Sequence, residues 1–595
     1  MDQKSKWFGY LAKLATVLVM CAAALAQSQA NGAKPATQGQ AGKQDNASSG
    51  DFQSPAVLKA TTRLVIVDVV ATDGKGVPIP GLTAKDFIVT ENGSPQEVRV
   101  FSFESPETGP DAAMALTGQP VKFPDNVVSN IPDRKPRGAL NVLLLDSLNT
   151  TSNNQASARR QMVKVLDKLP ADRPIAIYML GQKLQLLQDF TTDPVLLRNT
   201  VAELKSTNSA FLENPTGGPP PQYMGSIAAQ TPFSGVERLL RFVGEANDAQ
   251  TEQRTHATLE ALNTLARTLA GYPGRKNLIW ISEEFPIIID PASTNFGDDV
   301  SRTSEALASS QVAVYTIDAR GVAGNTFFKA ETYQDQVGRQ QFGRGLQQNM
   351  STESAERVDA HSTMNNVAEI TGGRAFYNVN EFDKAVRQSL DDGSTYYTLG
   401  YYPANKQWDG KFRKIKVKLD RPDARLRYRL GYFALDPTTY SNKDAAQRAQ
   451  EFGQALNLDN PVSTALLFRA AIFPPSEKTH NKVALNYLVD AHQIIFEKQD
   501  DGLQHANLDY AVEIYSSKGD PIKTEVTSIA AALKPDAFAH VMQTGFPYQK
   551  TLDLQPGDYT LRLGVRDNRT GLIGTVTGKL NVPVQEANQK PVRQN

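Results

Sequence analysis

The sequence contains very little of several features that would define a function class. It has one cysteine, Cys21, in 595 residues, which excludes a disulfide scaffold and a cysteine-based zinc or haem site. Lys plus Arg and Asp plus Glu both number 63, so the formal net charge is zero and bulk charge does not draw the chain to nucleic acid. The six histidines include no H-E-x-x-H motif and no close pair, so a zinc hydrolase has little support.

Motifs for nucleotide binding and acyl transfer are missing from the sequence as well. It contains no G-x-S-x-G elbow, no Walker A loop and no G-x-G-x-x-G fingerprint. Because Cys21 belongs to the leader described next, the remaining chain has no cysteine nucleophile. These absences favour a protein that is not an enzyme.

Residues 1–26 have the pattern of an export signal. A positively charged start precedes an apolar run, and small residues lead to a cleavage site after Ala26. The run, Leu14–Leu25, is shorter than the roughly 20 residues that span a bilayer, and no later stretch is apolar for long enough. We therefore expect an exported protein with no transmembrane span after cleavage, located in the periplasm, on the cell surface or outside the cell.

Composition then divides the N-terminal part of the chain into three stretches. Residues 27–56 are polar and without periodicity, which is typical of a disordered linker. Residues 57–104 alternate like strands and carry the turn signals Asp73-Gly74 and Asn92-Gly93, so a small β module is expected. Residues 105–138 are polar and Pro-rich, which predicts a second linker.

Residues 139–393 alternate apolar strands with amphipathic helices. The run Asn141–Asp146 is continuously apolar up to its last residue, as a central parallel strand requires. Further strands are expected at 175–180, 277–281, 312–317 and 374–377, and helices at 156–169, 194–204, 236–246, 258–270, 301–308, 362–370 and 381–390. Two polar insertions interrupt the pattern, at 206–235 and 320–358.

The remaining chain returns to β character. Residues 394–436 form a β extension, residues 445–587 predict a C-terminal β-sandwich, and residues 588–595 form a disordered tail. The fold class expected is α/β: a Rossmann-like, mostly parallel sheet flanked by helices, with β-sandwich-like modules on its N-terminal and C-terminal sides.

A polar cluster is expected at the carboxyl edge of the parallel sheet, where open α/β sheets bind their ligands. The first strand ends in Asp146, and Asn149 and Thr150 follow in the next loop. Carboxylate, amide and hydroxyl oxygens together suit a hard cation such as Mg²⁺. Thr255, expected in a loop before the helix 258–270, and Glu283, after the strand 277–281, come to the same edge.

Several segments in order resemble the von Willebrand factor A-related family of exported acidobacterial proteins. They are LLLDSLNT, TLEALNTLARTLAGYPGRKNLIWIS, AVYTIDARG and TGGRAFYN, and the resemblance covers roughly residues 57–435. Von Willebrand A domains carry a metal-ion-dependent adhesion site built from a D-x-S-x-S loop, a threonine and an aspartate. The resemblance implies that these ligands correspond here to Asp146, Thr150, Thr255 and Glu283. Leu148 replaces the middle serine, and Asn149 offers a substitute oxygen.

Structural roles without a metal are open for the same residues. Asp146 can accept hydrogen bonds from backbone amides, as strand-end aspartates often do. Thr255 can belong to the N-cap region of a helix, and Glu283 can be solvated.

A basic ribbon is expected on one strand of the β extension. Lys414, Lys416 and Lys418 alternate with apolar residues, so the lysines share one face. They are candidates for binding an anionic partner. The alternative is an edge strand that lysines protect against unwanted pairing.

Taken together, the sequence predicts an exported, non-enzymatic binding or adhesion protein. Its partner would be a protein or glycan, engaged through the von Willebrand A-like domain with Mg²⁺ or another divalent cation at a degenerate site. The alternative is an enzyme or accessory subunit that acts on cell-envelope polymer, with the two insertions as lids.

Overall fold

A computed structural model describes most of the chain after the predicted leader and first linker. The described residues are 64–105, 123–132, 138–169, 173–207, 236–285, 297–322, 358, 360–377, 382–476 and 482–584. The predicted leader 1–26, linker 27–56 and tail 588–595 lie outside them, as do most of the insertions 206–235 and 320–358.

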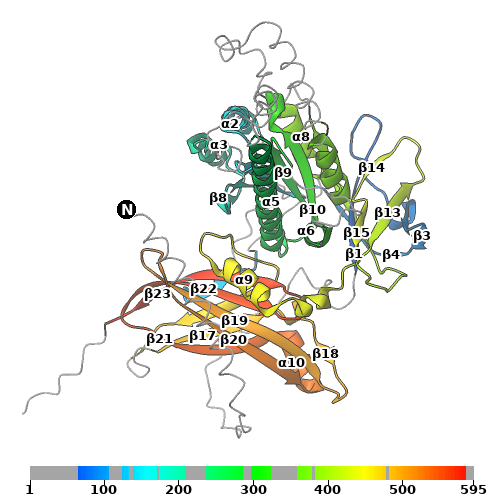
Figure 1. Ribbon diagram of the computed structural model, residues 1–595. Coiled ribbons are helices and arrows are strands. Elements are labelled where there is room, and N and C mark those ends of the chain that lie inside the picture. Colours follow the sequence, from blue (N-terminus) through cyan, green and yellow to red (C-terminus); the bar gives the residue numbers. More distant parts are fainter. Residues whose placement is uncertain are drawn as a thin grey trace, which may run out of the picture. The chain divides into compact units, whose positions relative to one another are not determined.

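A six-stranded sheet organises the central part of the chain (Figure 1). Its order is β11-β10-β9-β6-β7-β8, from Ala375–Phe376, Val312–Asp318, Lys276–Ser282, Leu140–Asp146, Ile175–Leu180 and Leu184–Thr191. All neighbours run parallel except β8, which pairs antiparallel with β7 at the sheet edge. The chain reverses its direction of growth between β6 and β9, as in doubly wound sheets, so the loops after these two strands meet at one edge.

Helices cover both faces of this sheet. They are α2 (Ser152–Leu166), α3 (Pro194–Glu203), α5 (Val236–Leu269), α6 (Gly297–Ser309), α8 (Phe382–Asp391), the short η3 (Ala319–Val322) and a helical stretch at 360–371. Leu143 of β6 packs with side chains of α2, α3 and α8, whereas Leu144 packs with those of α5 and α6. Successive strand residues therefore fill opposite cores, which is why β6 is apolar from Val142 to Leu145.

The first β module and the β extension fold together into one sandwich. One sheet has the order β14-β1-β12-β4 and the other β15-β13-β2-β3. The strands of the first are Arg425–Arg427, Val65–Thr72, Tyr396–Tyr401 and Val98–Glu104; those of the second are Gly431–Phe433, Phe412–Leu419, Phe87–Glu91 and Ser94–Gln96, with η1 at Ala84–Asp86. Segments 57–104 and 394–436, separate in the sequence prediction, thus share both sheets and one core.

A second sandwich fills the C-terminal part. One sheet has the order β21-β17-β16-β5; in the other, β18-β19-β22-β23, the strand β20 also pairs with β19. The strands are β5 (Val127–Ser129), β16 (Phe468–Phe473), β17 (Lys482–Val489), β18 (Glu497–Lys498), β19 (Gln504–Ser516), β20 (Pro521–Leu533), β21 (Phe546–Asp553), β22 (Gly557–Asp567) and β23 (Ile573–Val582). Helices here are η6 (Pro437–Asn442), α9 (Ala445–Leu456), η7 (Ala491–Gln493) and α10 (Pro535–Thr544).

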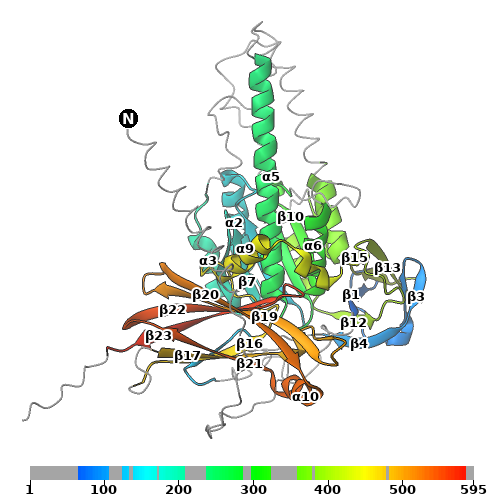
Figure 2. The same cartoon turned by 60° about the horizontal axis from the view of Figure 1, so that its bottom comes forward.

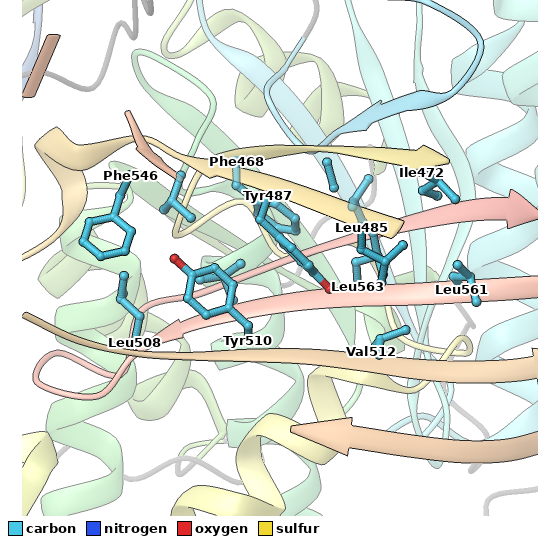
Figure 3. Packing of buried hydrophobic residues seen from close by; sticks show 14 of the residues in the cluster. Phe468, Ile472, Leu485, Tyr487, Leu508, Tyr510, Val512, Phe546, Leu561 and Leu563 are labelled. Carbon is cyan, nitrogen blue, oxygen red and sulfur yellow. The ribbon is translucent and has the colours of Figure 1, made fainter. Parts of the chain in front are cut away.

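The core of the C-terminal sandwich lies between its two sheets. Figure 3 shows Tyr487 and Leu485 of one sheet facing Tyr510 and Leu563 of the other. The ring centroids of Tyr487 and Tyr510 are 5.3 Å apart, and the Tyr487 hydroxyl donates to the Ala511 carbonyl. Strand β5 pairs with β16, so part of the predicted linker 105–138 belongs to this sandwich.

The predicted fold class is confirmed: a mostly parallel α/β sheet flanked by helices, with antiparallel β modules. Among the helices of the described ranges, none is both long and apolar enough to cross a membrane.

Glu305 of α6 is a half-buried acid with a buried Oε2 atom, and α6 packs against strand β15 of the N-terminal sandwich. Glu305 accepts a hydrogen bond from the backbone N–H of Phe433, while its Oε2 atom has no partner among the described residues. Burial raises the pKa of Glu305 to about 7, and the charge of Arg429 and the Phe433 N–H oppose that rise. The folded chain therefore binds a proton that the unfolded chain releases above about pH 4.5.

The Glu305→Gln variant is expected to be more stable than the wild type above pH 7 and equal to it near pH 4. A carboxyl whose pKa is raised on folding costs stability as pH rises from its unfolded to its folded pKa, and glutamine removes that cost. The gain is at most about 3 kcal/mol. Urea unfolding at pH 4 to 8 measures it, with the exposed Glu203→Gln as control. Parallel stability curves for wild type and Glu305→Gln would contradict the prediction.

Candidate functional site at the carboxyl edge of the sheet

Asp146 ends β6 and is almost completely buried, with 3% of its surface exposed. Oδ1 accepts the backbone N–H of Asn149 at 2.9 Å. Oδ2 accepts the Asn149 side-chain amide and the Trp280 indole N–H, each at 2.9 Å. The Ser282 hydroxyl also lies 2.9 Å from Oδ2 and 2.7 Å from the Glu284 carbonyl, and its one proton serves either oxygen. Burial raises the pKa of Asp146, and these hydrogen bonds oppose the rise.

This arrangement does not fit a divalent cation at Asp146. Three N–H groups already donate to this carboxylate, two of them to Oδ2, and an indole N–H can only donate, so it cannot share a cation with Asp146. Leu148, at the position of the family's middle serine, is buried in the core between the sheet and α5. Within the described residues, no group of three or more His, Cys, Asp or Glu side chains is placed to hold a metal. The contacts of Asp146 fit the alternative role, that of a strand-end aspartate that accepts hydrogen bonds from nearby donors.

Asn149, another member of the predicted set, has a buried oxygen without a hydrogen-bond partner in the described structure. Its side-chain N–H donates to Asp146 and to the Thr258 hydroxyl at 3.0 Å, while its buried Oδ1 has no partner there. One amide oxygen is far from the near-octahedral oxygen shell that Mg²⁺ requires.

Thr255 does not lie in a loop. The structure has one continuous helix, α5, where the sequence analysis expected two helices separated near residues 247–257 (Figure 2). That stretch contains neither glycine nor proline, so nothing in it ends a helix. The Thr255 hydroxyl donates to the Thr251 carbonyl of its own helix, at 2.8 Å. Thr258, one turn later, contacts Asn149 instead.

Glu283 connects the loop after β6 with the loop after β9 through hydrogen bonds. Its Oε2 accepts the backbone N–H and the hydroxyl of Thr151, at 2.9 and 2.8 Å, and Thr151 is the N-cap of α2. An acidic group is favourable at this end of a helix. The Glu283 N–H in turn donates to the Thr150 hydroxyl, at 3.2 Å. Both residues are therefore engaged with the chain itself.

The three carboxylates at the end of β6 and in the loop after β9 each have a different partner. Asp146 binds Asn149 and Trp280, Glu283 binds Thr151, and Glu284 forms an ion pair with Arg254 at 2.5 Å. These contacts do not bring two of the three carboxylates together as a pair, which general acid–base or glycosidase chemistry would use.

A hollow opens beside this network, between the ends of the strands, α2 and the segment after α3. Its polar lining comes from Ser147, Thr150, Gln155, Arg159, Lys205 and Ser206. The Gln155 amide donates to the carbonyls of Thr150 and Thr207, at 2.7 and 2.9 Å, and accepts the Thr207 N–H at 3.0 Å. Gln155 thus holds the two walls of the hollow at a fixed separation.

Lys414, Lys416 and Lys418 lie on the N-terminal sandwich and not on the α/β sheet. All three are exposed on β13, where Lys416 is opposite Thr90 and Lys418 opposite Ile88. β13 pairs with β15 at Phe412–Lys414 and with β2 at Ile415–Leu419. Of the described strands, only β2 therefore pairs with the stretch that carries Lys416 and Lys418, and the alternative of a protected edge strand stays a prediction. The lysines have no ion-pair partner among the described residues, and their binding role stays a prediction.

Comparison with known proteins gives structural similarity alone. The sequence matches no protein-family model and no curated protein. Among solved structures, an aerotolerance-related membrane protein from Bacteroides fragilis is 11% identical, with 43% of this chain and 99% of that chain covered and a TM-score of 0.23. A von Willebrand factor type A protein from Catenulispora acidiphila is 9% identical, with 61% and 80% covered and a TM-score of 0.20.

A third similar structure comprises three N-terminal domains of the type V pili tip protein Mfa5 from Porphyromonas gingivalis. It is 9% identical, with 82% of this chain and 99% of that chain covered and a TM-score of 0.23. The fold described above rests on the strand order and helix packing of the chain itself.

Proposed function

We propose that this chain is an exported, non-enzymatic binding protein whose α/β domain engages a protein or glycan at the carboxyl edge of its sheet without a metal ion. The observation that carries the proposal is the closed network around Asp146. Three elements, the loop after β6, α5 and β9, supply its hydrogen-bond partners, so the loop is already ordered by the chain. A preorganised surface binds at a lower entropic cost.

Two further features support a binding role over catalysis. The carboxylates at the end of β6 and after β9 are each engaged separately, and the hollow beside them has a mostly apolar lining with a few hydroxyl, amide and basic side chains. A mostly apolar lining with a few polar groups is typical of binding sites. The resemblance of the sequence to exported von Willebrand A-related proteins agrees with this role, and it supports location outside the cytoplasm.

Binding is expected to survive chelation and to fail when the hollow is filled. The test measures binding of the full mature chain to an array of glycans and envelope proteins, in Mg²⁺ and in EDTA. The Ser206→Arg variant places a bulky side chain in the hollow and should weaken binding by about tenfold or more. Ser94→Arg, at an exposed position of β3, is the matched control and should bind like the wild type.

Two outcomes would contradict the proposal. Loss of binding in EDTA would restore the metal-dependent adhesion hypothesis. Equal binding by Ser206→Arg and Ser94→Arg would remove the hollow from the recognition surface.

A further inference from the structure

The C-terminal sandwich has a long strand with one unpaired side. β20 pairs antiparallel with β19 from Pro521 to Leu533, and no strand in the described part of the chain pairs with its other side (Figure 1). A free strand edge exposes backbone N–H and C=O groups that can pair with another strand. This edge belongs to a different domain from the proposed binding surface, so the two proposals are independent.

The features that protect natural edges lie in the first part of this free edge, and the remainder has none of them. Charges, prolines and bulges usually prevent pairing. Here Pro521 and a bulge lie at the start of the strand, and Lys523 and Glu525 are its only charged residues. The most exposed apolar side chains are Ile522 and Val526, at 55% and 53%. The rest of the strand, from Val526 to Leu533, is uncharged.

The sequence of the first half of β20 is complementary to itself in an antiparallel pair. If Thr524 lies on a two-fold axis, it faces Thr524 of the second copy. Lys523 then lies opposite Glu525, twice by symmetry. Opposite charges are a favourable cross-strand pair. The bulge at Ile522 interrupts the regular alternation there, so the register rests on Lys523 and Glu525.

Other contacts leave this half of the strand available. α10 follows directly after Leu533 and packs against β20 and β21, so the second half is the more crowded one. Lys523 and Lys550 lie 2.7 and 3.0 Å from the Glu525 carboxylate, so both charged residues of β20 are ion-paired within the chain, and a second copy would add one more oppositely charged neighbour to each. We propose that β20 is a self-association edge, through which two copies of this chain pair antiparallel about Thr524.

Cysteine cross-linking tests the register directly. With Cys21 replaced by serine, Thr524→Cys introduces the only cysteine, and it should form a disulfide-linked dimer under mild oxidation, because facing strand residues lie within disulfide reach. Ser528→Cys is the matched control on the same strand. In this register the two copies of residue 528 are about 27 Å apart, so it should remain monomeric. Efficient cross-linking by Ser528→Cys in place of Thr524→Cys would overturn the register.

Charge reversal tests the association itself. Sedimentation equilibrium of the full chain should show a monomer–dimer equilibrium. Lys523→Glu puts like charges opposite each other twice and should weaken the dimer by about tenfold. Lys579→Glu, exposed on β23 at the other side of the sheet, should leave it unchanged. A wild-type chain that stays monomeric at about 100 µM would overturn the proposal.

Discussion

Glu91→Ala is expected to lower the free energy of unfolding by about 3–5 kcal/mol, because it leaves a buried guanidinium without its counter-charge. Glu91 and Arg413 are 3% and 2% exposed, and Oε1 lies 3.3 Å from Nη1. The hydroxyls of Tyr401 and Tyr432 each donate to Oε2 at 2.9 Å. The variant therefore removes the acceptor of three donors in one core.

Urea denaturation followed by tryptophan fluorescence measures this effect. Trp408 reports on the region, since the Arg413 guanidinium lies 5.5 Å from the centre of its ring. Lys416→Ala, exposed on the same strand as Arg413, is the control and should change stability by less than about 0.5 kcal/mol. A loss below about 1 kcal/mol for Glu91→Ala would show that the sandwich does not depend on this pair.

The same ion pair shows what the sequence could not reveal about the fold. Alternation predicts the strands of 57–104 and 394–436 one by one, because side-chain period depends on local residues. It does not show that Glu91 and Arg413, far apart in the chain, meet in one core. Strand pairing between distant segments is decided by tertiary packing, and the pairing of β5 with β16 was hidden for the same reason.

In the α/β domain, prediction succeeded where burial was complete. The strands β6, β7, β9 and β10 are nearly continuous apolar runs, because helices cover both of their faces. β8 was missed. It is an edge strand, LQLLQDFT, with exposed glutamines and no regular alternation. For helix α5 the sequence pattern predicts two helices, because polar residues interrupt the apolar periodicity near residues 247–257, although that stretch contains neither glycine nor proline.

At the candidate site, the sequence identified the position of Asp146 but not its partners. The resemblance to a metal site predicts oxygen ligands around Asp146, and this set does not include an N–H donor such as Trp280. One available signal was the spacing of Trp280 and Ser282 on β9, since residues two apart on a strand share a face. The sequence does not show whether Thr255 or Thr258 contacts the loop after β6. That depends on which face of α5 meets Asn149.

The Asp146→Ala variant distinguishes two roles of this carboxylate: the acceptor of a buried hydrogen-bond network, or a metal ligand. If Asp146 served mainly as a cation ligand, its loss would spare the fold. In the structure it is the common acceptor for Asn149 and Trp280, both buried, and unpaired buried donors each cost about 1–3 kcal/mol. We therefore expect Asp146→Ala to lower the free energy of unfolding by about 3–5 kcal/mol, in the presence or absence of divalent ions.

Thermal unfolding in Mg²⁺ and in EDTA supplies the second half of this test. A cation bound only to the folded chain raises its stability in proportion to the logarithm of the ion concentration. The wild type is expected to show no such rise, because the buried Asp146 carboxylate already accepts three N–H donors and no other acidic side chain of the described residues joins it to hold a metal. Glu283→Ala is the control: it breaks the contact with Thr151 at the partly exposed rim and should cost only about 1 kcal/mol. A stable Asp146→Ala variant, combined with Mg²⁺ stabilisation of the wild type, would show that the carboxylate exchanges its hydrogen bonds for a metal ion.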